Sequence, residues 1–103
     1  MSVTMRILQQ FDPAHENEFM ELERKFAALE ARRSDYPKGR RMQPIAAGWP
    51  CNTLVWQCEF PDLASARKAL SFFQGDAAHE KLLAKQLPFF KEARVEFYEN
   101  LEL

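Results

Sequence analysis

The two histidines are the side chains of this sequence best suited to moving a proton near neutral pH, because imidazole titrates in that range. His15 and His79 each stand in the first turn of a predicted helix. The helix dipole disfavours the charged form there, and a neutral imidazole could act as a base. His15 has no periodic relation to the neighbouring apolar positions, which is more typical of a surface residue. His79 heads a short helix expected to cover the edge of a sheet and is the better candidate. With no third ligand at metal-binding spacing, we expect no metal site.

A cluster of cations is the second candidate for chemistry. Five Lys or Arg residues fall within ten positions and are opposed only by Asp35: Arg32, Arg33, Lys38, Arg40 and Arg41. Such a cluster could hold a carboxylate or phosphate of a substrate. A helix C-terminus followed by a solvated loop is the commoner explanation. Tyr36 lies within the cluster and could add a hydroxyl donor.

Trp56 is the third candidate, because it stands in the middle of a predicted strand on the face expected to meet the helices. It can be a core anchor whose indole N–H needs a partner, or it can wall a pocket between sheet and helices. Trp49 lies in a loop and could sit on the pocket rim or at a subunit interface. The predicted ligand-binding residues are therefore Trp56, His79, Tyr36 and Arg40, and the sequence indicates no catalytic set.

The cysteines and the motif inventory exclude several classes of enzyme. Cys51 and Cys58 have no His or cation adjacent in sequence, so nothing marks either as a nucleophile. In an extended segment they would be about 20 Å apart, too far for a disulfide, and we expect free thiols in a reducing compartment. No Gly-rich phosphate loop, Ser-centred elbow or metal-ligand repeat is present.

Length and charge restrict the partners. The 103 residues suffice for one domain, residues 1–103, with one core. The 14 Lys and Arg against 15 Asp and Glu give a net charge of -1, which provides no basic field for nucleic acid or anionic lipid. The apolar runs are far shorter than the roughly 20 residues that cross a bilayer, and no secretion signal stands at the N-terminus. We expect a cytoplasmic protein.

Three segments alternate apolar and polar residues as strands do. The clearest is 52–60, in which Leu54, Trp56, Cys58 and Phe60 share one face. Residues 3–11 and a segment from about Ala93 repeat the pattern. A short strand is expected around 41–47, and Pro44 places it at a sheet edge or a bulge.

Helices follow the first and the central strand. Asp12-Pro13 is a strong start signal, and Phe19, Leu22, Phe26 and Leu29 make the apolar stripe of the first helix. Asp62 begins a second helix, and Asp76 caps a short further helix that Pro88 terminates. The order predicts an α+β, ferredoxin-like βαββαβ fold, with a four-stranded antiparallel sheet and helices on one face.

The other sheet face mixes apolar and charged side chains. It can be a solvated face, which antiparallel sheets tolerate, or it can meet a second copy in a twofold dimer. The periodicity does not separate the two.

Three stretches carry a resemblance to a known superfamily: NTLVWQCEFPDLASARKAL, FFQGDAAHEKLLAKQLPFF and the closing ARVEFYENLEL. They are similar to the second half of dimeric α/β-barrel proteins, with NIPSNAP-like and small monooxygenase-like members nearest. The resemblance implies a homodimer with facing sheets. Members include cofactor-independent oxygenases, haem-degrading enzymes, isomerases and proteins without known activity. Haem-degrading members use an Asn in the first strand, and VTMRILQQF has none. We therefore expect no haem and no other cofactor.

Two functions remain open at this stage. One is a cofactor-independent, oxygenase-like or isomerase-like enzyme acting on a small hydrophobic or aromatic molecule. The alternative is a non-catalytic homodimer that binds a small ligand or a protein. RNA binding, which uses the same element order, is disfavoured because Trp56 and Phe60 share the helix-facing side and the strand has neither Gly nor a cation.

Overall fold

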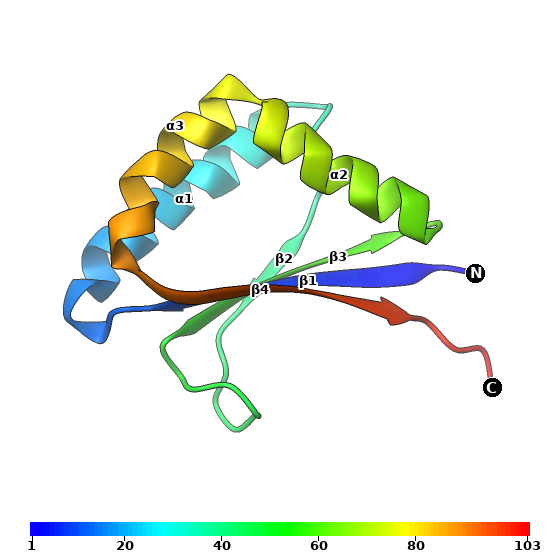
Figure 1. Ribbon diagram of the computed structural model, residues 1–103, viewed down its shortest axis with the longest axis horizontal. Coiled ribbons are helices and arrows are strands. Elements are labelled where there is room, and N and C mark those ends of the chain that lie inside the picture. Colours follow the sequence, from blue (N-terminus) through cyan, green and yellow to red (C-terminus); the bar gives the residue numbers. More distant parts are fainter.

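One antiparallel sheet of four strands, in the order β2-β3-β1-β4, forms the base of the fold (Figure 1). The computed structural model describes all residues from Met1 to Leu103. The strands are β1 (Val3–Phe11), β2 (Arg40–Met42), β3 (Thr53–Phe60) and β4 (Phe90–Glu99). The helices are α1 (Glu16–Arg32), α2 (Leu63–Gly75) and α3 (Ala77–Gln86), with short 3-10 turns η1 (Pro13–His15) and η2 (Leu87–Phe89). This is the predicted ferredoxin-like α+β fold, and the fold class is confirmed.

The helices all cover one face of the sheet, and they cover the predicted one (Figure 1). Trp56 and Cys58 of β3 pack with Met5 of β1 against Ala66 and Ala69 of α2. Since successive strand residues point to opposite faces, the residues that alternate with these in β1 and β3 lie on the open face. The helix-facing assignment of the central strand is therefore confirmed.

Three element boundaries differ from the sequence-based expectation. The strand expected at 41–47 is only Arg40–Met42, because Pro44 has no N–H to continue a ladder. The last strand begins at Phe90, since Phe90 pairs with Phe11 across a register shift next to Gln10. Asp12 does cap a helical turn, accepting from Ala14 N, but this turn is η1, and α1 begins only at Glu16. His15 therefore precedes α1 instead of lying in its first turn.

Residues 43–52 form a loop beneath the open face of the sheet (Figure 1). The Gln43 side chain donates to the Cys51 carbonyl at 2.7 Å and closes the loop. Leu8 and Val55, both on the open face, are buried. The Trp49 ring lies on the same side, 5.4 Å from the guanidinium of Arg94. None of the helices combines the length and the apolarity that crossing a bilayer requires.

Asp76 joins the helices to the segment that follows α1. Its carboxylate caps α3 by accepting from His79 N at 3.1 Å, and it accepts from the Tyr36 hydroxyl and from Arg33 at 2.8 Å. The hydrogen bonds from Tyr36 and Arg33 lower the pKa of Asp76, Tyr36 contributing most. The backbone N–H of Asp76 bonds the Phe73 carbonyl where α2 ends, and its carboxylate fixes where α3 begins and how the chain leaves α1.

Gly39 leaves room for Trp56. A Cβ atom on Gly39 would lie 2.5 Å from Cζ2 of the Trp56 indole and closer still to Cε2 and Nε1. Such an overlap forces either the backbone or the ring to move. The close approach allows Trp56 to lie flat under the segment that leads into β2.

We expect Gly39→Ala to destabilise the protein by about 1–3 kcal/mol, the usual cost of overpacking a filled site. The midpoint of urea denaturation would measure it. Gly48→Ala is the matched control, because nothing lies within 4 Å of a Cβ at Gly48. Equal midpoints for the two variants would show that Trp56 does not depend on this gap.

We expect Asp76→Asn to unfold more easily than the wild type at pH 7, because a neutral amide is a weaker acceptor than a carboxylate for Arg33 and for the Tyr36 hydroxyl. The folded pKa of Asp76 lies below its unfolded value of 3.8, so its stabilisation is complete above that pH and is lost as the pH falls through the folded pKa. The difference in stability between wild type and variant should therefore become smaller below about pH 4. Thermal unfolding at pH values from 7 to 2 measures this difference. Glu102→Gln, at an exposed carboxylate, is the control and should unfold as the wild type does at every pH. A difference between wild type and Asp76→Asn that stays constant with pH would contradict the role of the charge.

Candidate functional site

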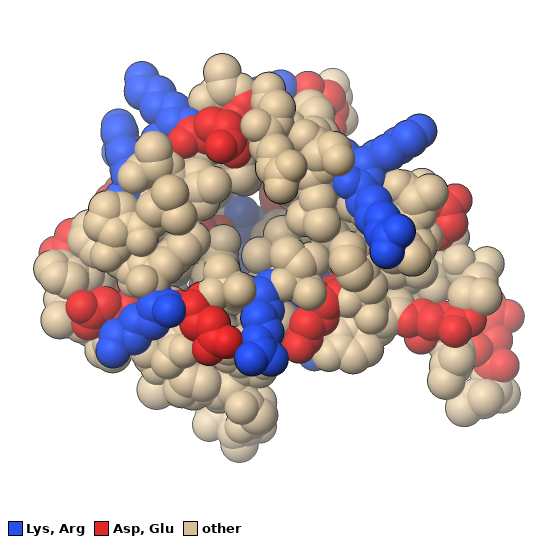
Figure 2. All heavy atoms as spheres, in the orientation of Figure 1, with Lys and Arg blue, Asp and Glu red and all other residues tan.

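A cavity of about 420 Å³ lies between the helix-facing side of the sheet and the three helices. Figure 2 shows it as a hollow in the middle of this side of the molecule, with charged atoms visible in its depth. Of its 18 lining residues, 11 are hydrophobic, so its wall is mainly apolar. The sheet contributes Ile7, Gln9, Arg41, Trp56, Phe90, Ala93 and Val95, and the helices contribute Glu23, Phe26, Glu30, Leu70, Phe73, Gln74, His79, Glu80 and Leu83.

The cavity floor is formed by β1 and β4, in which Ile7 pairs with Val95 and Gln9 with Ala93. β4 is the edge strand nearest the viewer in Figure 1, and β1 is the only element against which it packs extensively. Val95 is accordingly 43% exposed although it is on the helix side of the sheet. The cavity therefore opens along β4, between this strand and the angle formed by α2 and α3.

Aromatic rings form the inner wall. The Trp56 ring meets Phe73 edge to face at a centroid distance of 5.9 Å. Phe73 stacks on His79 at 5.0 Å, and Phe26 lies 5.1 Å from His79 on another side. Tyr36 continues this wall, with its ring 5.9 Å from Phe73. Edge-to-face and stacked pairs of this kind hold each ring in one orientation.

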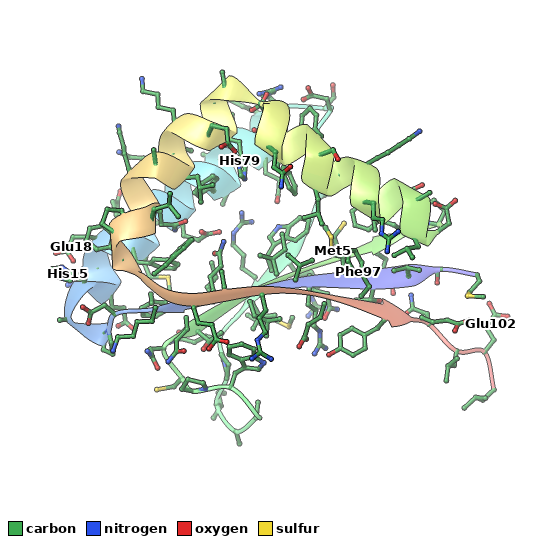
Figure 3. All side chains as sticks on the ribbon, viewed as in Figure 1. Met5, His15, Glu18, His79, Phe97 and Glu102 are labelled. Carbon is green, nitrogen blue, oxygen red and sulfur yellow. The ribbon has the colours of Figure 1, made fainter.

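His79 is the one imidazole in this wall. Figure 3 places it on the inner side of the helical layer. Its Nδ1 lies 3.2 Å from Glu80 Oε1, and its backbone N–H donates to the Asp76 carboxylate. The ring is thus positioned from both sides by aromatic neighbours and by one carboxylate, as a proton-transfer group would need to be.

A buried polar chain crosses the back of the cavity. The Trp56 indole N–H donates to Glu30 Oε1 at 2.9 Å, and Arg41 Nη1 donates to Glu30 Oε2 at 3.3 Å. Arg41 Nε donates to Glu23 Oε2 at 2.7 Å, and Gln86 Nε2 donates to Glu23 Oε1 at 3.1 Å. Glu23 and Gln86 are both buried. Two carboxylates thus share one guanidinium within a mainly apolar wall.

Three of the four predicted ligand-binding residues, Trp56, His79 and Tyr36, line this cavity. The Tyr36 hydroxyl donates to Asp76, so its ring is the part offered to a ligand. Burial and the hydrogen bond to Asp76 raise the pKa of Tyr36, which keeps its hydroxyl protonated.

Arg40 does not line the cavity. It pairs with Gln57 and shares the open sheet face, whereas its neighbour Arg41 pairs with Trp56 and faces the helices. The predicted cation cluster is therefore divided. Arg33 binds Asp35 and Asp76, and Lys38 donates to the backbone carbonyls of Glu30 and Arg33 at the end of α1.

Glu23 and Glu30 were not identified from the sequence, and Arg41 was named only as a member of the cation cluster. A signal for the two acids does exist, because Phe19, Glu23, Phe26 and Glu30 step by four, three and four along α1. This spacing puts both acids on the buried face of the helix. Buried carboxylates need partners, so the pattern also requires a cation nearby.

His15 stands apart from this site. It is half exposed, with Nδ1 3.4 Å from Glu18, and Figure 3 shows the pair at the far end of the helical layer from His79. No three His, Cys, Asp or Glu side chains converge as a metal-ligand set. Cys58 is buried, and burial raises the pKa of its thiol, while Cys51 is exposed.

No protein-family model matches this sequence, and a search of curated proteins finds no match. Solved structures do resemble it. A NIPSNAP family protein from Agrobacterium tumefaciens aligns over 99% of this chain and 95% of its own, with a TM-score of 0.80 and 8% identity. An uncharacterized NIPSNAP domain protein from Burkholderia xenovorans covers 98% and 95%, with a TM-score of 0.77 and 14% identity.

A third similar structure is SnoaB from Streptomyces nogalater, described as a cofactor-independent oxygenase. It covers 99% of this chain and 95% of its own, with a TM-score of 0.66 and 15% identity. At such low identities the likeness establishes the fold alone. The chain therefore shares its ferredoxin-like fold with NIPSNAP proteins and with small cofactor-independent oxygenases, as the resemblance in its sequence implied.

Proposed function

We propose that this protein binds a small, largely apolar molecule with aromatic character in the cavity beneath its helices. The observation that carries the proposal is the cavity itself, because about 420 Å³ of mainly apolar wall surrounds a few fixed polar groups. Binding sites for small molecules typically have this size and this composition. Trp56, His79 and the Tyr36 ring are the proposed binding residues within it.

The bound molecule could be turned over without a cofactor, in an oxygenase-like or isomerase-like reaction. The positioned imidazole of His79 favours this form, with His79 as the base, and the likeness to an oxygenase supports it. In the non-catalytic alternative the molecule is only held, and the uncharacterized NIPSNAP neighbour is compatible with that. To separate the two, a ligand found on the purified protein is incubated with the protein in air, recovered and analysed by liquid chromatography with mass detection. Turnover gives a new peak that is absent with His79→Phe, with a changed mass for an oxygenase-like reaction and the same mass for an isomerase-like one. A single unchanged peak indicates that the ligand is only held.

We also propose a homodimer in which the open sheet faces meet. Polar side chains on this face are already paired with each other: Arg6 donates to Gln57 at 2.8 Å, and Tyr98 donates to Glu96 at 2.8 Å. Arg6 also lies 5.4 Å from the centroid of the Tyr98 ring. Such pairing lowers the cost of removing these groups from water.

We propose a cytoplasmic location because both cysteines are free thiols, which persist in a reducing compartment.

Filling the cavity should abolish ligand binding and leave the fold intact. Ala93 lies on the cavity floor in an edge strand, so we expect Ala93→Phe to weaken binding of a naphthalene-based fluorescent probe by more than about tenfold. Ala84→Phe, on the exposed side of α3, is the control and should bind as the wild type does. If both variants bind the probe equally, the molecule binds elsewhere and the proposed site is wrong.

Reversing one charge on the open face should dissociate the dimer. Arg6→Glu would face Glu96 directly across the β1–β4 pair and would place like charges in the proposed interface. We expect light scattering to give twice the chain mass for the wild type and a monomer for the variant. Arg67→Glu, exposed on α2, should remain dimeric. A monomeric wild type would refute the facing-sheet arrangement.

A further inference from the structure

The charged groups of the cavity indicate the charge of its ligand. We propose that the cavity selects an organic cation, a small amine or quaternary ammonium carried on an apolar or aromatic body. The inference rests on the proposed function of the cavity and adds the ligand class. It depends on three features of the wall: its net charge, the way Arg41 is engaged and the aromatic rings.

The net charge of the lining is negative. Its formally charged side chains are Glu23, Glu30, Glu80 and Arg41, and it contains neither Lys nor Asp. Three carboxylates and one guanidinium sum to a formal charge of -2 with His79 neutral. In a partly enclosed cavity such charges are screened less than on an open surface. An anionic ligand would therefore be repelled and a cationic one attracted.

The single cation of the lining is already paired. Arg41 lies 2.7 Å from Glu23 and 3.3 Å from Glu30, and all three side chains are mostly buried. One positive charge between two negative charges leaves a surplus of one carboxylate at the back of the cavity. Each carboxylate oxygen has a second lone pair, so an ammonium N–H could still be accepted there.

Aromatic rings provide the second element of cation recognition. Trp56, Phe26 and Phe73 all line the cavity. The face of an aromatic ring attracts a cation within about 6 Å of its centroid, and Trp is the strongest of these rings. Tyr36 of the same wall already holds a cation in this way, since Arg33 lies 4.7 Å from its centroid. Rings and surplus carboxylate together favour a charged nitrogen on an apolar body.

Three probes that share one ring system test the inference: 2-naphthylmethylammonium, 2-naphthalenemethanol and 2-naphthoate. We expect the cation to bind about tenfold more tightly than the alcohol and the anion to bind most weakly, as measured by titration calorimetry at low salt. Equal affinities, or tightest binding of the anion, would overturn the charge selection and leave the binding cavity in place. If none of the three probes binds, both the charge selection and the proposed binding function are wrong.

Two variants test whether the carboxylates of the cavity cause the preference for the cation. Glu80→Gln changes an exposed residue at the cavity mouth and Glu30→Gln a residue at its back that keeps an oxygen for the Trp56 N–H. Each should reduce the preference for the cation over the alcohol, measured as the ratio of the two affinities in the same variant, by about threefold or more. Glu21→Gln, on the exposed side of α1 and paired with Arg24, should leave the preference unchanged. If Glu21→Gln lost as much of the preference, the preference would come from the overall charge of the protein, and the role of the cavity carboxylates would be wrong.

Discussion

The carboxylate of Glu30 is the contact on which the arrangement of helix and sheet depends. A buried indole N–H without an acceptor is costly, and Glu30 provides that acceptor for Trp56. The same carboxylate accepts from Arg41 of β2, and the carbonyl of Glu30 receives Lys38. One residue near the end of α1 thus binds the central strand, the edge strand and the connection between them. The gap left by Gly39 allows the indole to lie where Glu30 can reach it.

Local signals explain why most of the fold could be predicted from the sequence. Alternation over 52–60 and the aspartate caps at Asp62 and Asp76 depend only on near neighbours, and the structure contains each of them. The early start of β4 depends on pairing with a distant strand, which no local pattern encodes. Arg41, and not the predicted Arg40, lines the cavity, because alternation over a strand of only three residues before a proline is too short to show which side chain faces the helices.

The cavity arises from the break between α2 and α3. Asp76 ends one helix and caps the next, so the two helices diverge over the sheet instead of lying on it as one rod (Figure 1). The divergence leaves β4 uncovered and opens the space that His79 and Phe73 line from above. Structures with 8% and 15% identity share the fold, so the course of the backbone does not fix which side chains line this space.

The pairing of Glu23, Arg41 and Glu30 also affects how this protein would respond to selection for heat resistance. Buried ion pairs seldom stabilise a fold more than well-packed apolar residues of similar volume would. A search for more heat-resistant variants should therefore converge early on Glu23 and Arg41 and replace them with Leu, Met or Phe, while Glu30 is retained as the acceptor for the Trp56 N–H. Such variants would keep the sheet and the helices but lose most of the polar wall of the cavity. Heat resistance and ligand recognition thus place opposite demands on the same two side chains.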